Sequence, residues 1–184
     1  MLSHGCVFPD ALARCERSDL LLDFPDLHLR TVEKDRQGGL MLEVESSDPV
    51  TGCPGCGVVA TGHGRVMGEV IDAPWAGRAV RIRRRKPRWI CREEVCSVVS
   101  FVEQDPAVCV PRGLLSTGAI RRAMDLLRFE GLTIQGLNRQ LGTTWNTIWS
   151  QVQPLLTAAA NDPVYRFRMF RITGGLGASS HTQL

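Results

Sequence analysis

The sequence lacks any long hydrophobic run, and this absence argues against a membrane-spanning helix. No apolar segment in the 184 residues approaches the roughly 18 residues that such a helix needs, and Leu20-Leu21-Leu22 is followed at once by Asp23. A secretory signal is also missing. No Lys or Arg precedes an apolar stretch at the N-terminus, and Pro9 and Asp10 interrupt the only candidate segment. We therefore expect a soluble, cytoplasmic protein without a membrane partner.

Strong compositional bias is absent as well. Hydrophobic residues make up 43% of the sequence, which excludes a collagen-like chain, a coiled coil and wholesale disorder. The net charge is only +3, but its distribution is uneven. Residues 1–50 contain five basic and ten acidic side chains, whereas residues 51–100 contain nine basic and four acidic ones. The basic residues therefore gather in a segment where a polyanion can bind.

The sequence contains seven cysteines, and an odd number in a reducing compartment favours metal binding over disulfides. Cys53 and Cys56 form a C-x2-C pair, and Cys91 and Cys96 form a C-x4-C pair after a gap of 34 residues. Four thiolates complete a tetrahedral shell and leave no position for water, so we expect a structural Zn²⁺ ion. The alternatives are unpaired core thiols, a redox pair or an iron site. Ordinary roles are expected for the other cysteines and for one histidine, which are Cys6, Cys15, Cys109 and His63.

The first half of the chain has the pattern of β-strands. Partial alternation over residues 27–32 and 40–44, separated by Gln37-Gly38-Gly39, predicts a β-hairpin because the two glycines permit positive φ. Strand signals without a helical period continue from residue 66 to residue 101. The breaks expected in that region are Pro74 and Gly77.

A basic strand lies inside this region. The alternation Arg81-Ile82-Arg83 places charge on one face and apolar atoms on the other, so that one face packs and the other is free for phosphates. Arginine suits bidentate contacts with phosphate oxygens or guanine edges. The alternative is a solvated charged face that binds nothing. The candidate DNA-contacting residues of the strand are Arg78, Arg81, Arg83, Arg84, Arg85, Lys86 and Arg88.

The spacing of apolar residues becomes helical after Pro111. Ser116 can cap a first helix, which Gly131 ends, with Ile120, Met124, Leu127 and Phe129 at roughly helical spacing. A second helix fits residues 133–141, with Ile134, Leu137 and Leu141 on one face. A third fits residues 145–152, and Pro154 either limits it or begins its continuation. The inward side chains expected in the third helix are Trp145, Ile148, Trp149 and Val152.

Residues 133–148 fit a helix-turn-helix, with Gly142 at the turn and Thr144 as the cap of the second helix. Asn138 departs from the pattern, because close helix packing usually requires Ala or Gly there. A plain helical bundle is the alternative. The side chains expected to reach base edges or phosphates in a major groove are Asn146, Thr147, Ser150 and Gln151. Those expected to hold the DNA backbone are Arg121, Arg122 and Arg139.

Taken in order, these features resemble bacterial insertion-sequence transposases of the ISL-three class over roughly residues 20–165. The matching segments are Cys53-Pro54-Gly55-Cys56-Gly57, Asp72-Ala73-Pro74-Trp75-Ala76-Gly77-Arg78-Ala79-Val80, the arginine strand, Trp89-Ile90-Cys91 through Cys96, and the helix-turn-helix. The resemblance implies a zinc ribbon and a helix-turn-helix that recognise the terminal inverted repeats of the element. It assigns the metal to Cys53, Cys56, Cys91 and Cys96.

Members of that class also carry a C-terminal RNase H-like domain whose three carboxylates bind divalent metal and perform strand cleavage and joining. No Asp or Glu follows Pro163 in this sequence, so a carboxylate set for two-metal catalysis is not expected there. We expect a truncated, non-enzymatic transposase that binds element ends without cutting them.

We therefore expect an α+β protein in four parts. Residues 1–50 form a β-hairpin region that packs on the zinc ribbon, and residues 51–110 form a four-cysteine zinc-ribbon-like domain that contains the basic strand. Residues 111–165 form a small three-helix helix-turn-helix domain. Residues 166–184 form a disordered or frame-shifted tail. The expected partner is double-stranded DNA, which implies association with the nucleoid, and a second copy of the chain or a full-length transposase is a further partner. The alternatives are a stand-alone transcriptional regulator, a zinc-braced protein-interaction module and a thiol oxidoreductase.

Overall fold

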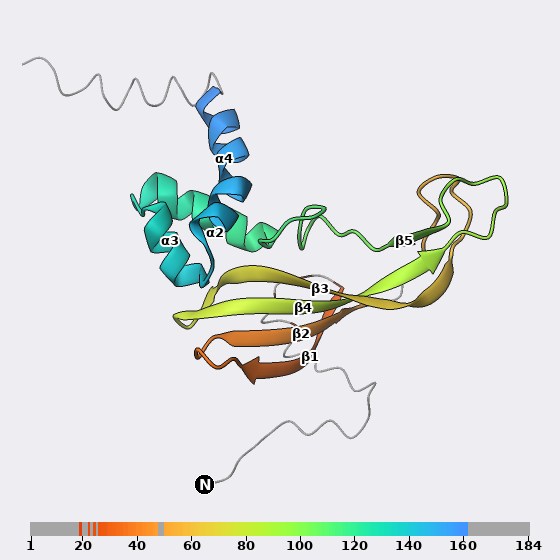
Figure 1. Cartoon of the computed structure of the whole chain (residues 1–184), viewed down its shortest axis with the longest axis horizontal. Helices are drawn as coiled ribbons and strands as arrows, with labels where there is room; N and C mark the ends of the chain where they lie inside the picture. The colour runs from red at the N-terminus through yellow and green to blue at the C-terminus, as the bar shows by residue number, and fades with distance from the viewer. Residues whose placement is uncertain (1–18, 20–21, 23, 25, 48–49, 162–184) are drawn as a thin grey trace, which may run out of the picture.

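The computed structural model describes residues 19, 22, 24, 26–47 and 50–161. In this part of the chain five β-strands come first and three helices follow (Figure 1). The predicted α+β class is confirmed. The predicted tail over residues 166–184, and the cysteines at positions 6 and 15, lie outside the described residues.

The predicted N-terminal hairpin is present. Strands β1 (Leu27–Lys34) and β2 (Leu40–Ser46) pair antiparallel, and both run about two residues beyond the predicted segments. Gly38, in the connecting turn, has a φ of 85°, a conformation that glycine adopts without steric cost.

A second, much longer hairpin forms the centre of the sheet. It consists of β3 (Thr61–Trp75) and β4 (Arg78–Ile90), so the predicted break at Pro74 is wrong. Pro74 lies at the edge of the sheet, inside a register shift between Asp72 and Trp75, where a residue without an N–H is tolerated. The strand order is β1-β2-β4-β3, and β2 pairs with β4 in parallel.

The long hairpin extends beyond β2 and connects two different ends of the molecule. Near its turn, Val80 to Arg85 of β4 pair with β2 as well as with β3. At the other end, Arg88 to Ile90 pair with β5 (Ser100–Val102). The 13 residues from Arg78 to Ile90 span roughly 40 Å at the usual rise of a strand. Figure 1 shows the helices near the turn and β5 with its loops at the opposite end.

The predicted cap of the first helix is present, and the second helix is capped by Thr133, which was predicted to be its first residue. In α2 (Thr117–Phe129) the side chain of Ser116 accepts a hydrogen bond from the Ala119 N–H, and in α3 (Ile134–Leu141) Thr133 accepts one from the Gly136 N–H. Gly142 ends α3 with a φ of 59°. Helix α4 (Trp145–Asn161) continues past Pro154 to the end of the described residues, so of the two predicted outcomes the continuation is correct.

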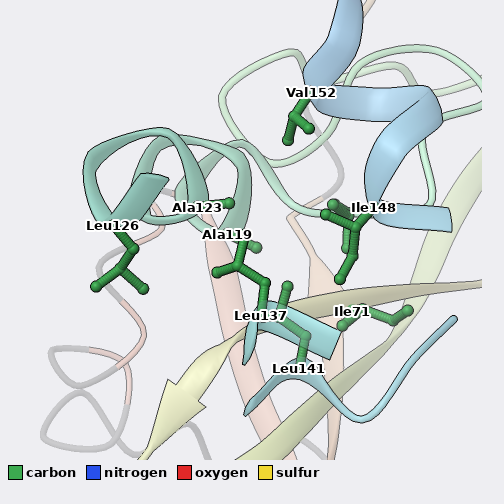
Figure 2. Packing of buried hydrophobic residues seen from close by; sticks show 9 residues of the cluster. Ile71, Ala119, Ala123, Leu126, Leu137, Leu141, Ile148 and Val152 are labelled. Carbon is green, nitrogen blue, oxygen red and sulfur yellow. The ribbon is translucent and has the colours of Figure 1, made fainter. Parts of the chain in front are cut away.

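Two hydrophobic clusters stabilise the fold. One joins the helices to β3 and contains Ile71, Leu137, Leu141, Ile148 and Val152 among its buried residues (Figure 2). The other joins β2 and β4 to the loop around Val108.

The inward faces of α2 and α4 agree with the prediction only in part. Ile120, Met124, Leu127 and Trp149 are partly buried against the helical cluster. The buried residues of α2 are Ala119, Ala123 and Leu126, whereas Phe129 is 73% exposed. Trp145 is 44% exposed and stacks on Trp149, with ring centroids 5.4 Å apart, instead of pointing inward. Ile148 and Val152 are fully buried as expected.

Close packing within α3 occurs at Gly136 and not at the predicted Asn138. A Cβ on Gly136 would lie 2.7 Å from Leu132 Cδ1, so a larger residue would require the Leu132 side chain to move. Asn138 is half-buried, and its Oδ1 is buried without a hydrogen-bond partner. The residue that departs from the sequence pattern therefore also has an unfavourable environment in the structure, because a buried polar atom without a partner costs free energy.

The helices are held firmly against the sheet. The Ile71 N–H donates to Leu114 O and the Ser116 N–H donates to Ile71 O, so residues 114–116 bind to the free edge of β3. The Ser116 hydroxyl also donates to the Asp72 carboxylate. Together with Ile71 in the helical cluster, these contacts fix the position of the helices relative to the long hairpin.

Candidate metal centre and nucleic-acid interface

The four paired cysteines meet at the end of the long hairpin that lies away from the helices. The Sγ atoms of Cys53 and Cys96 are 3.6 Å apart, as are those of Cys56 and Cys91, and all four lie within 4.8 Å of one another. A tetrahedral zinc ion with Zn–S bonds of about 2.3 Å requires sulfur atoms roughly 3.8 Å apart. The geometry of the thiols therefore fits Zn²⁺ with little adjustment.

Local backbone geometry presents the sulfur atoms of each pair. The knuckle of the first pair closes through bonds from the Cys53 N–H to Val58 O and from the Gly57 N–H to Cys53 O. The Gly55 N–H also donates to Cys53 Sγ at 3.4 Å, and the Val98 N–H donates to Cys96 Sγ at 3.4 Å. Such donors favour the thiolate form.

Gly55 is required by the contact between the two pairs. A Cβ at this position would lie 2.9 Å from Val98 Cγ2 and 3.2 Å from Cys96 Sγ. The glycine therefore lets the first knuckle approach the second closely.

The ionisation of the four thiols is mutually dependent. Burial opposes ionisation of Cys53, but backbone N–H groups and the neighbouring thiols outweigh it and lower its pKa to about 7. The Glu93 N–H favours the thiolate of Cys91, but burial and the neighbouring thiols raise its pKa to about 12. One thiolate thus disfavours the next, and a dication between the sulfurs is needed to hold all four as ligands.

The end of the sheet around the cysteines has no hydrophobic cluster. We call residues 50–66 and 87–102 the zinc end. Neither cluster described above contains a residue from it. Its buried apolar side chains are Cys53, Ala60, Pro87, Trp89 and Cys91, and several of its valines are exposed. The metal site therefore takes the place of a core at this end.

The basic strand differs from the prediction, because one central arginine is buried. Arg84 is only 6% exposed. Its guanidinium donates to Ser46 Oγ at 2.9 Å and to Glu103 at 2.8 Å, and Asp105 lies at 3.8 Å. The structure therefore removes Arg84 from the candidate phosphate contacts. It lies on the buried face because it alternates in step with Val80 and Ile82.

Other arginines of the strand are bound to carboxylates on the neighbouring strands. Arg81 contacts Glu69 at 3.3 Å, and Arg85 contacts Glu45 at 3.5 Å. Strand β2 places Glu43 and Glu45 directly opposite Arg83 and Arg85. Carboxylates of the acidic first segment therefore lie beside part of the basic strand, and the charged face is less free for phosphates than predicted.

The remaining basic residues of the strand are more accessible. Arg78, Arg83 and Arg88 are exposed, and Arg88 donates to Ser100 Oγ at 3.2 Å. Lys86 is half-buried and lies over Gly68, where a Cβ would come within 3.3 Å of Lys86 Cε. His63 is exposed, as expected.

The side chains of α4 that were predicted to reach base edges or phosphates lie on two sides of the helix. Asn146 and Ser150 are exposed, whereas Thr147 and Gln151 are half-buried. Thr144 caps the helix as predicted, since its Oγ1 accepts from the Thr147 N–H. The three arginines predicted to hold the DNA backbone, Arg121 and Arg122 on α2 and Arg139 on α3, are all exposed.

Sequence reasoning missed two residues on the exposed side of α4. At 100° per residue, Gln153 and Thr157 lie on the same side as Asn146 and Ser150, opposite Ile148 and Val152. All four residues of this polar stripe are exposed. The stripe becomes visible in the sequence only if the helix is continued through Pro154.

The burial of Arg84 leads to a prediction about stability. Replacing Arg84 by Met should lower the free energy of unfolding by about 3 kcal/mol, because Glu103 loses its cationic partner in a largely desolvated position. Urea unfolding monitored by circular dichroism measures this change. The neighbouring Arg83→Met variant is the control, and its effect should stay within about 0.5 kcal/mol since Arg83 is exposed. Equal effects for the two variants would contradict a structural role for Arg84.

Comparison with known proteins places these features in a family context. Residues 49–96 match the family described as the zinc-finger of transposase IS204/IS1001/IS1096/IS1165. Neither the curated proteins nor the solved structures contain a match to the chain. The matched residues include both cysteine pairs, β3 and β4. The chain therefore contains a zinc ribbon of the ISL3 transposase type, and Cys53, Cys56, Cys91 and Cys96 form its structural zinc site.

Proposed function

We propose that this chain binds duplex DNA and recognises the terminal inverted repeats of an insertion sequence, with a role in recognition and not in cleavage. The observation that carries the proposal is the fusion of a transposase-type zinc ribbon to a helical unit whose α4 has an exposed polar stripe. The zinc ribbon supplies the family context, and α4 supplies a surface that suits a groove.

Helix α4 has the features of a helix that enters a major groove. Its inward face is anchored by Ile148 and Val152, both fully buried against α2, α3 and β3. The opposite face carries short polar side chains, which donate to and accept from base edges. A short turn of Gly142, Thr143 and Thr144 joins α3 to α4, which is the connection typical of a helix-turn-helix.

Exposed arginines flank this helix. Arg121 and Arg122 lie on α2, and Arg139 lies on α3. We assign them to the phosphates on either side of the groove, because a guanidinium forms bidentate bonds with phosphate oxygens. Arg81 has a different role, since it donates to Gly142 O at 3.2 Å and so positions the turn before α4.

Salt-dependent affinity tests the proposal. The zinc-loaded protein, titrated by fluorescence anisotropy into a labelled 30-base-pair duplex, should bind with a logarithmic salt slope of about −3 or steeper, since at least three arginines neutralise phosphates. The triple variant R121Q/R122Q/R139Q should flatten the slope by about 3 while retaining its fold. Absence of binding even at low salt would overturn the proposal and favour a zinc-braced protein-interaction module.

A further inference from the structure

Two hairpin turns lie side by side at the helix end of the sheet. The parallel pairing of β2 with β4 brings Leu40 opposite Val80, so the turn between β1 and β2 lies beside the turn between β3 and β4. A Cβ on Gly39 would lie 3.2 Å from Ala79 O, which shows how closely the turns approach. We define the tip surface as the exposed side chains Lys34, Arg36, Trp75 and Arg78.

The cations of the tip surface differ from those of the middle of β4. Among the described residues, no carboxylate lies within ion-pair distance of Lys34, Arg36 or Arg78. The carboxylate of Asp35, which lies between two of them, accepts from the Gln37 and Gly39 N–H groups at 2.8 Å. Glu33 is the other acidic residue next to these turns. The surface therefore has free positive charge where the strand interior does not.

The second turn projects an aromatic ring beside this charge. Trp75 is 47% exposed, and the two residues after it, Ala76 and Gly77, have φ values of 49° and 74°. An alanine in the left-handed region costs about 1 kcal/mol or more, so the tight turn is maintained against a local penalty. The turn holds Trp75 and Arg78 opposite each other at the very end of the sheet.

The tip surface is fixed next to the start of α4. A Cβ on Gly142 would lie 2.9 Å from the Cβ of Ala79, and Arg81 donates to Gly142 O. Trp145 begins α4 three residues later, a separation of at most roughly 10 Å along the chain. Figure 1 shows the turn between α3 and α4 close to the end of the long hairpin. Since a major groove is about 12 Å wide, both elements are able to contact one duplex at once.

We propose that the tip surface contacts the phosphate backbone that borders the groove occupied by α4. This inference rests on the proposed function, and it adds a second contact region made by the sheet. In this contact, phosphates are neutralised by Lys34, Arg36 and Arg78. The ring of Trp75 covers the sugar-phosphate backbone between these phosphates. The zinc end, roughly 40 Å away along β4, has no part in this contact.

Two matched double variants test the proposal. R36Q/R78Q removes two exposed arginines from the tip surface, and R88Q/R92Q removes two exposed arginines from the zinc end. The salt slope of duplex binding should flatten by about 2 for the first variant and stay within about 0.5 of the wild-type value for the second. The charge-preserving variant R36K/R78K should retain the wild-type slope. This result would show that the flattening in R36Q/R78Q comes from lost charge and not from a change in the fold.

The outcomes separate this inference from the proposed function. If the wild-type protein binds no duplex, the proposed function fails and the inference fails with it. If the wild-type protein binds and R36Q/R78Q keeps its slope, only the contact by the tip surface is overturned. The same conclusion follows if R88Q/R92Q flattens the slope as much as R36Q/R78Q does.

Discussion

Removing zinc is expected to unfold the zinc end while the helices and the N-terminal hairpin stay folded. Structural zinc contributes on the order of 10 kcal/mol in small domains, and the zinc end has no hydrophobic cluster to replace it. The helices and β2 have their own clusters. Chelation, or the substitution Cys91→Ser, should therefore abolish amide hydrogen-exchange protection over residues 50–66 and 87–102 but keep it in α2, α3 and β2.

Cys109 offers the matched control for this prediction. Its Sγ lies 3.3 Å from the carbonyl oxygens of Val110, Gly113 and Leu115, any one of which can accept the single thiol proton, and burial raises the pKa of this thiol. Cys109→Ser should keep the full zinc content and the protection of the zinc end. Unchanged protection after chelation would show that the metal does not support the fold, and simultaneous loss in the helices would contradict the local role assigned to it.

Replacing Asn146 or Gln153 is expected to relax the choice of DNA sequence. Each exposed amide side chain is suited to a bidentate contact with adenine, which discriminates against the wrong base by about 1 to 3 kcal/mol. The affinity ratio between the preferred duplex and its single-base variants should therefore fall by roughly 5- to 150-fold, with little change in the salt slope. Competition titrations with labelled duplexes measure this ratio.

Gln151→Ala is the control, because it removes the same side chain from a half-buried position on the flank of the same helix. It should retain the wild-type ratio. If Gln153→Ala and Gln151→Ala reduce binding to every sequence by the same factor, α4 does not read bases through the polar stripe.

Local features made much of the fold predictable. The glycine turn between β1 and β2 and the helix caps at Ser116 and Thr144 depend on residues close in sequence, and the structure contains each of them. The metal site was predictable for a related reason. Each cysteine pair is presented by one tight turn, so only the meeting of the two turns depends on the rest of the fold.

The distribution of charge was not predictable in the same way. Alternation along β4 gives two faces, but it does not reveal that Glu43 and Glu45 lie beside Arg83 and Arg85. That neighbourhood arises from the parallel pairing of β2 with β4, which joins residues about 40 positions apart. The same pairing places the turn that contains Arg36 beside the turn that precedes Arg78, so the tip surface also requires the three-dimensional structure.

The exposure of Trp145 has a similar origin. Its spacing from Ile148 and Val152 suggests an inward position, but α4 begins at Trp145, beside the turn after α3, and the ring stacks on Trp149 at the surface. A residue in the first turn of a helix has no preceding turn to cover it. Hydrophobic period alone does not show this effect of the helix end.

The most direct test of the account is the affinity of the zinc-loaded protein for a duplex carrying the inverted repeats that flank its gene, compared with a scrambled duplex of the same composition. Anisotropy titrations at several salt concentrations, with and without a chelator, provide both affinities. Our account predicts at least 10³-fold tighter binding to the repeat duplex at physiological salt, the lower range for sequence-specific proteins. Equal affinity for the two duplexes would contradict recognition of terminal repeats.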